Sequence, residues 1–161
     1  MARKIEQLGV TSDGREVFLD YADTNIAYHL LETPSLLNLV REALPSMKVS
    51  NEKQVVVEKD MGRVVGTTNL VGTDHGDEIV YAKRRGREKY SRFVKNKQLV
   101  PCRSIVIVLR WREERYYLWT AMCGHLLPPE AYDDNSVFNA THALVYDESL
   151  VQLNTVTELK P

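Results

Sequence analysis

Alternating apolar and polar residues predict β-strands over most of the chain beyond residue 50. These segments are short and rich in β-branched or aromatic side chains, and turn-forming residues such as Asp60-Met61-Gly62 separate them. Glu113-Glu114 lies between two long alternating segments and suits the tip of an antiparallel hairpin. The predicted strands are residues 54–58, 63–70, 78–84, 104–112, 116–124 and 141–147.

The N-terminal part of the chain has a different pattern. Residues 3–21 are typical of a hairpin, with the turn Ser12-Asp13-Gly14 between alternating segments. Apolar residues then recur at helical spacing, which predicts one helix that begins at Asp23 or Thr24 and a second that begins at Thr33-Pro34 and ends at Pro45. Further along, the pattern of residues 88–95 favours another short helix.

The order of these elements predicts an α+β fold, with N-terminal helices packed on a mainly antiparallel sheet of four to six strands. We expect residues 1–50, the hairpin and helices, to belong to the same domain as residues 51–161, which supply the sheet. At 161 residues the chain is long enough to bury one core of its own. The second face of such a sheet would be open to a ligand.

Composition places the chain among ordinary globular proteins. Apolar residues make up 43% and charged residues 27% of it, and we find neither a signal peptide nor an apolar run as long as a membrane span. Two cysteines, Cys102 and Cys123, are too few for a disulfide framework. We therefore expect a cytoplasmic protein with reduced thiols and no membrane partner.

Charge is distributed unevenly along the chain. The net charge is −1, yet eleven Lys or Arg residues and a single acid, Glu88, lie between Lys83 and Arg112. We expect residues 83–103 to form a basic loop whose positive field suits a polyanion, above all RNA. The alternative is a charge run that is merely solvated. The predicted nucleic-acid-binding residues are Arg84, Arg85, Arg87, Lys89, Tyr90, Lys95 and Lys97.

Strand alternation leads to a second prediction about this segment. If the strands align, Lys83, Thr120 and His142 lie on one open face, together with Arg92 from the loop. Cleavage of RNA without a metal needs a base for the 2′-hydroxyl proton, an acid for the leaving oxygen and cations for the charge on phosphorus. Histidine suits the proton transfer, whereas Lys and Arg stabilise charge. The predicted catalytic residues are therefore His142, Lys83, Arg92 and Thr120.

Other chemistries have weaker signals. The chain lacks a P-loop, an HExxH sequence, an EF-hand loop and a GxSxG elbow, and we expect neither a metal nor a cofactor. Asp74-His75-Gly76-Asp77-Glu78 offers ligands for a divalent cation, but consecutive acids in a turn are usually solvated. Cys123 with His125 offers a thiol and a base, and an inert thiol is the simpler interpretation. Four aromatic residues either stack bases or pack in the core. They are Trp111, Trp119, Tyr116 and Tyr117.

Four segments between residues 60 and 147 resemble a group of small uncharacterised bacterial proteins. They are DMGRVVGTTNLVGT, DEIVYAKRRGREKYSRFVKNKQ, LWTAMCGHLLPP and FNATHALVYD, and the last three are similar to the YAKR, Y-x-R-F-V-K, LWSAW-like and NHAL segments of that group. The order of elements also resembles the ribonuclease class of barnase, EndoU, certain colicins and RelE-type toxins, in which helices precede a four-stranded antiparallel sheet that carries the active site.

The resemblance implies a metal-independent endoribonuclease, toxin-like or of phage type, with the four predicted catalytic residues at its site. The chain departs from the group where Thr120-Ala121-Met122-Cys123 replaces a Ser-Ala-Trp pattern and where Asn139-Ala140 precedes the histidine segment. The alternative is a module without chemistry, which binds nucleic acid or an acidic protein such as an inhibitor.

Overall fold

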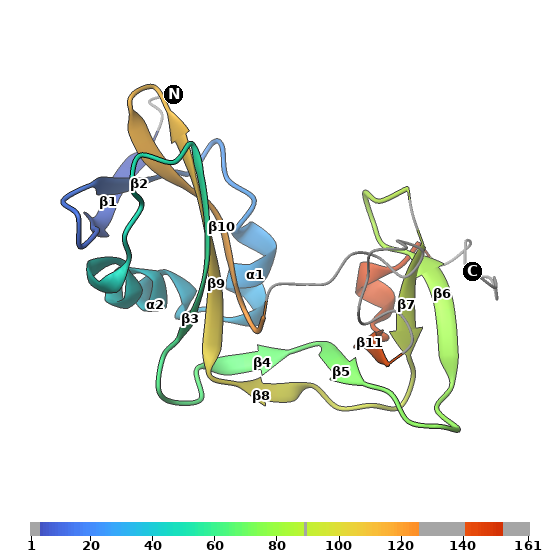
Figure 1. Cartoon of the computed structure of the whole chain (residues 1–161). Coiled ribbons are helices and arrows are strands. Elements are labelled where there is room, and N and C mark those ends of the chain that lie inside the picture. The colour runs from blue at the N-terminus through green and yellow to red at the C-terminus, as the bar shows by residue number, and fades with distance from the viewer. Residues whose placement is uncertain (1–3, 89, 126–140, 153–161) are drawn as a thin grey trace. The chain divides into compact units, whose positions relative to one another are not determined.

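The structure is a computed structural model that describes residues 4–88, 90–125 and 141–152. The chain divides into two compact units, each of which combines separate stretches of sequence. Unit 1 contains residues 1–66 and 102–126, and unit 2 contains residues 67–101 and 127–161. In the described part of the chain, the boundaries between the units lie in β4 (Gly66–Thr68) and β8 (Val100–Cys102), which pair with each other (Figure 1).

The described strands of unit 1 form a five-stranded sheet of order β1-β2-β10-β9-β3. Neighbouring strands are antiparallel, except that β2 and β10 run parallel. The hairpins that the sequence predicts at both ends of this unit are confirmed. The elements are β1 (Ile5–Val10), β2 (Glu16–Asp20), α1 (Ala27–Glu32), α2 (Leu36–Ala43), the 3₁₀ turn η1 (Leu44–Ser46), β3 (Gln54–Asp60), β9 (Ser104–Arg112) and β10 (Arg115–Cys123).

One face of this sheet carries the core of unit 1. The register places Leu109 of β9 opposite Leu118 of β10, and alternate side chains of both strands point to the same side. α2 lies on this side (Figure 1), and its apolar stripe packs into the core. Glu113 and Glu114, at φ 52° and 62°, form the turn that closes the β9–β10 hairpin. The buried residues of α2 are Leu36, Leu39, Val40 and Ala43.

The helices begin later than the sequence predicts. The Thr24 hydroxyl accepts a hydrogen bond from the N–H of Ile26 at 3.3 Å and donates to the carbonyl of Trp119 at 2.9 Å, which ties the start of α1 to β10. α2 begins at Leu36, after a turn in which its N–H donates to the carbonyl of Thr33 at 3.0 Å. Within the described residues, no helix combines the length and the apolar character that a membrane span requires.

Unit 2 contains a smaller sheet, whose described strands follow the order β5-β11-β7-β6. β7 and β11 run parallel, and the other neighbours are antiparallel. Buried side chains lie in two clusters, one around Phe93 and Val80 and the other around Val94 and Val71. The elements are β5 (Leu70–Gly72), β6 (Ile79–Lys83), β7 (Tyr90–Val94), β11 (His142–Val145) and the 3₁₀ turn η2 (Glu148–Leu150).

The mixed α+β class and its largely antiparallel pairing are confirmed, with more strand than helix. The prediction of one sheet is wrong, because the described strands form sheets of five, four and two strands. The helices follow the β1–β2 hairpin and so are not the first elements of the chain. The helix predicted at residues 88–95 is also wrong, because β7 pairs there with strands on both sides. The basic segment 83–103 therefore contains β7 and β8 and is not one loop.

Asp13 ties the turn between β1 and β2 to the segment that leads into β3. Its carboxylate accepts hydrogen bonds from the Thr11 hydroxyl at 2.6 Å, from the N–H of Ser50 at 3.0 Å and from the N–H of Val49 at 3.2 Å. The bond from Thr11, and then those from the backbone, lower the pKa of Asp13 to about 2, since they favour the charged form. The ionised carboxylate therefore stabilises the folded state.

We predict that Asp13→Asn lowers the stability of the protein at pH 7 but not near pH 2. The pKa is about 2 in the folded state against an ordinary value of 3.8, so the stabilising effect is present above about pH 4 and is lost between there and pH 2. Urea midpoints of the two proteins should converge across this range. Glu113→Gln changes an exposed carboxylate and should leave the midpoint unaltered. A difference in urea midpoint between Asp13→Asn and the unchanged protein that is the same at every pH would contradict this account.

Candidate nucleic-acid interface

The structure distributes the four predicted catalytic residues over both units. Lys83 ends β6, Arg92 lies in β7 and His142 begins β11, all within the sheet of unit 2. Thr120 belongs to β10 of unit 1, where it is 7% exposed and its hydroxyl donates to the carbonyl of Asn25 at 3.5 Å. Its hydroxyl thus has a structural hydrogen bond inside unit 1.

Within the sheet of unit 2, Lys83 and Arg92 lie on one face and the His142 side chain lies on the other. Lys83 is opposite Tyr90, two residues before Arg92, so Lys83 and Arg92 share a face. Leu144 is opposite the residue that follows Arg92, and His142 lies two residues before Leu144 on the same strand. The imidazole and the two cations therefore do not border one hollow on this sheet.

Arg92 joins β7 to β11 through the backbone. Its Nη1 donates to the carbonyl of His142 at 3.0 Å. Its Nε is buried and has no hydrogen-bond partner among the described residues. Nδ1 of the His142 ring lies 2.8 Å from the hydroxyl of Thr141. The guanidinium thus contacts the main chain of His142, while a neighbouring hydroxyl contacts its ring.

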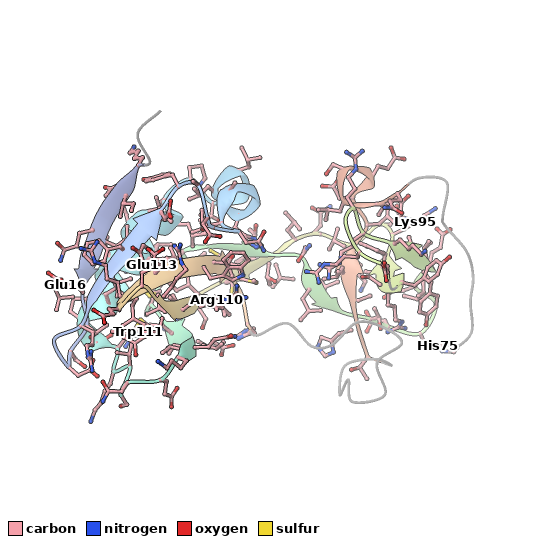
Figure 2. All side chains as sticks on the ribbon, turned by 90° about the horizontal axis from the view of Figure 1, so that it is seen from above. Glu16, His75, Lys95, Arg110, Trp111 and Glu113 are labelled. Carbon is pink, nitrogen blue, oxygen red and sulfur yellow. The ribbon has the colours of Figure 1, made fainter. Side chains whose placement is uncertain are left out.

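Ion pairs involve four of the eleven cations of the basic segment among the described residues. Lys97 lies 2.9 Å from Asp74 and 3.3 Å from Asp77. Lys95, which Figure 2 labels, lies 3.7 Å from Glu78. Hydrogen bonds to Asp74 and Asp77 raise the pKa of Lys97. Local carboxylates therefore offset the positive charge at this end of the sheet. The other two pairs join Arg103 to Asp60, and Arg112 to Asp20 and Asp23.

Three further cations of the segment contact other groups. Arg84 Nε donates to the Ser91 hydroxyl at 3.1 Å, and the Arg110 guanidinium lies 4.0 Å from the ring centroid of Trp119. Arg92 is the third, and Lys89 is outside the described residues. The remaining cations are Lys83, Arg85 and Arg87, which we call the hairpin-tip cations. Among the described residues, no carboxylate lies within ion-pair distance of these three side chains.

Backbone hydrogen bonds fix the end of the β6–β7 hairpin that carries these cations. The N–H of Arg85 donates to the carbonyl of Leu150 at 2.8 Å. The N–H of Gln152 donates to the carbonyl of Lys83 at 2.9 Å. The segment that follows β11 therefore holds the chain at the point where it leaves β6.

Gly86 turns the chain between Arg85 and Arg87. Its φ of 75° lies in the left-handed region, which favours glycine, and the N–H of Arg87 donates to a carbonyl three residues earlier at 2.9 Å. Both arginines are exposed. Where the turn meets the strands, the Lys83 ammonium lies 5.5 Å from the ring centroid of Tyr90. This end of the hairpin combines uncompensated cations with an aromatic ring, which are the groups that hold phosphates and bases.

The sequence-based prediction does not include the contacts that three arginines of the β9–β10 hairpin make with aromatic rings of unit 1. Arg110 and Arg112 alternate along β9, and each stacks on an aromatic residue of β10, as the register of the two strands allows. The alternate spacing of Arg110 and Arg112 in the sequence is the feature from which these contacts could be predicted. The pairs are Arg110 with Trp119 at 4.0 Å, Arg112 with Tyr117 at 4.2 Å and Arg115 with Phe18 at 4.6 Å.

Tyr116 and Tyr117, which the sequence allows either to stack bases or to pack in the core, are buried. Tyr116 is 1% exposed and Tyr117 is 4% exposed. The Tyr116 hydroxyl donates to the carbonyl of Glu52 at 2.7 Å. The Trp111 ring packs edge-on against the Tyr116 ring, with the centroids 4.9 Å apart. The core interpretation is therefore confirmed for both tyrosines.

Cys123 and His125, the possible thiol and base, each contact another residue. Cys123 Sγ accepts a hydrogen bond from the Thr33 hydroxyl at 3.6 Å. His125 Nδ1 lies 3.2 Å from a carboxylate oxygen of Glu58. These contacts favour a structural thiol.

Comparisons of the chain with known protein families, with curated proteins and with solved structures find no match. The resemblance to the bacterial group and to the ribonuclease class therefore stays a prediction.

We predict that Arg92→Ala destabilises unit 2 by about 1–3 kcal/mol, because it removes a charge-assisted hydrogen bond and leaves the carbonyl of His142 without that donor. Hydrogen exchange should accelerate in β6, β7 and β11 and stay slow in β9 and β10. Arg87→Gln, at the exposed turn, should change exchange in neither sheet. Unaltered protection in Arg92→Ala together with weaker RNA binding would instead make Arg92 an RNA contact.

Proposed function

We propose that the protein binds single-stranded RNA through the hairpin-tip cations, without cleaving it. The observation that supports this proposal is the sorting of the eleven cations. Ion pairs, hydrogen bonds or a contact with the Trp119 ring engage those that lie elsewhere in the described segment. Lys83, Arg85 and Arg87 lie at one turn and have no carboxylate partner among the described residues. The contact of Lys83 with the Tyr90 ring leaves its charge unpaired. Cations that meet no internal acid are those that gain most from an external phosphate.

The residues at the turn suit a single strand better than a duplex. Arg85 and Arg87 project from an exposed turn, and Tyr90 offers a ring beside the Lys83 ammonium. Phosphates can contact the cations while an unpaired base stacks on the ring, an arrangement that tolerates any sequence. With three cations we expect an affinity of non-specific strength, about 10⁻⁴–10⁻⁶ M at physiological salt.

We predict that binding of a fluorescent single-stranded RNA weakens with salt, with a slope of log K against log salt near −2, since each phosphate contact contributes about −0.7. Replacing two of the three cations in Arg85→Gln/Arg87→Gln should reduce the slope to about −0.7. Fluorescence anisotropy at several salt concentrations measures both values.

The matched control is Lys95→Gln/Lys97→Gln, which removes the same amount of charge from the same unit. Because Asp74, Asp77 and Glu78 already offset these lysines, the slope should stay near that of the unchanged protein. Equal losses in the two double variants would show that only total charge matters, and would overturn the assignment to the turn.

Metal-independent cleavage by His142, Lys83, Arg92 and Thr120 stays a prediction of the sequence, and labelled RNA tests it. We expect the RNA to stay intact in EDTA, because the imidazole and the cations of unit 2 lie on opposite faces of their sheet. Shortening of the RNA by the unchanged protein, lost in His142→Ala with RNA binding retained, would support catalysis and contradict the proposal. Denaturing gels of both proteins supply the measurement.

A further inference from the structure

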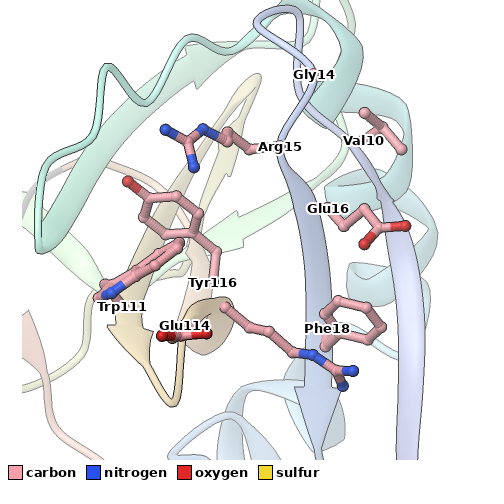
Figure 3. Close-up of a pocket in the computed structure, with 9 residues that line it drawn as sticks. Val10, Gly14, Arg15, Glu16, Phe18, Trp111, Glu114 and Tyr116 are labelled. Carbon is pink, nitrogen blue, oxygen red and sulfur yellow. The ribbon is translucent and has the colours of Figure 1, made fainter.

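Unit 1 has a pocket at one end of its sheet. The residues that line it all belong to unit 1, whereas the hairpin-tip cations belong to unit 2. The pocket has a volume of about 420 Å³ and is lined by residues of the β1–β2 hairpin and of the β9–β10 hairpin (Figure 3). A smaller hollow of about 170 Å³ shares Arg15, Trp111 and Tyr116 with it. We call the two parts together the Trp111 pocket. The larger part alone falls within the size range of small-molecule sites.

Trp111 is a partly exposed aromatic residue of this pocket, and Phe18 is a second one in the larger part. Its ring borders both parts, and its contact with the Tyr116 ring is edge-on, with an angle of 69° between the planes. The Arg15 guanidinium lies 5.8 Å and the Lys53 ammonium 5.9 Å from the centroid of the indole. A planar ring that stacks on Trp111 would therefore lie within reach of two cations.

The charges of the lining residues differ between the two parts. In the larger part, Arg15 and Arg115 are accompanied by Glu16 and Glu114, so the charge is balanced. The lining of the smaller part contains Arg15 and Lys53, together with Asn51, and no carboxylate. Within the described residues, no carboxylate lies in ion-pair distance of Arg15 or Lys53. An anionic group is therefore favoured in the smaller part, and a neutral ring with hydrogen-bond donors in the larger one.

Two tight turns with left-handed backbone lie at the pocket. Ser50 and Asn51 have φ values of 50° and 62°, and Glu113 and Glu114 have values of 52° and 62°. Such values are costly for residues other than glycine, and least so for Asn. Asn51 lines the smaller part and Glu114 the larger. Both pairs are the central residues of tight turns, which place Asn51 and Glu114 at the pocket.

We propose that the Trp111 pocket binds a nucleotide with one phosphate. The base stacks on Trp111 in the larger part, where Glu16 and Glu114 can accept hydrogen bonds, and the phosphate contacts Arg15 and Lys53 in the smaller part. A free mononucleotide and a nucleotide of an RNA strand share this chemistry. The proposal goes beyond the RNA-binding function, because none of its residues belongs to unit 2.

The two tryptophan side chains of the protein provide the readout. In two-dimensional NMR spectra of the full chain, the indole N–H signals of Trp111 and Trp119 are assigned with Trp119→Phe. AMP should shift the Trp111 signal and leave the Trp119 signal in place. Adenosine, which lacks the phosphate, should bind about tenfold more weakly, as should AMP to Lys53→Gln, since a charge-assisted contact is lost in each case. Arg103→Gln, at the opposite end of the β3–β9 pair, is the control and should bind AMP as the unchanged protein does.

A short RNA with a 5′-phosphate distinguishes the two sources of the nucleotide. The titration uses Arg85→Gln/Arg87→Gln, so that the outcome does not depend on the hairpin tip. Tighter binding of the strand than of AMP at Trp111 would make an RNA end the ligand, whereas tighter binding of AMP would make it a free nucleotide. No shift of the Trp111 signal with any of these compounds at about 10 mM, or equal affinity for AMP and adenosine, would overturn the proposal.

Discussion

Hydrogen bonding of β7 to β6 on one side and to β11 on the other decides which side chains of unit 2 can act together. Side chains alternate between the two faces along each strand. One pair of opposite residues between β7 and β6, and one between β7 and β11, therefore assign every residue of the three strands to a face. A slip of β11 by one residue would move the His142 ring to the face of Lys83 and Arg92. The hydrogen bond from Arg92 to the His142 carbonyl favours the observed register over that alternative.

The same hairpin concentrates positive charge at one of its ends. At the end near residues 74–78, carboxylates lie beside Lys95 and Lys97 and offset their charge. At the other end, Arg85 and Arg87 flank a glycine turn without such partners among the described residues. A field of this form attracts a polyanion to one edge of the unit. Such a field would supply affinity for phosphates, whereas the His142 ring lies on the opposite face of the sheet, which is why we propose binding without cleavage.

Local patterns predicted the elements that depend on local interactions. The β9–β10 hairpin has both strict alternation and a turn at Glu113-Glu114, and its prediction was confirmed. The sequence predicts a helix where β7 lies because EKYSRFVK allows either period, and the partner strand β11 lies far along the chain. The basic segment could be counted from the sequence, but the pairing of Lys97 with Asp74 depends on the folded loops around β6 and β7. The faces of His142 and Lys83 depend on strand order, which one sequence does not contain.

The most direct test of this account is amide hydrogen exchange of the full chain with and without a single-stranded RNA at low salt. If the hairpin tip holds the strand, added protection should centre on residues 83–90 and leave β11 unchanged. Arg85→Gln/Arg87→Gln should abolish that added protection. Added protection centred on residues 141–145, around the His142 ring on the opposite face, would contradict the central claim.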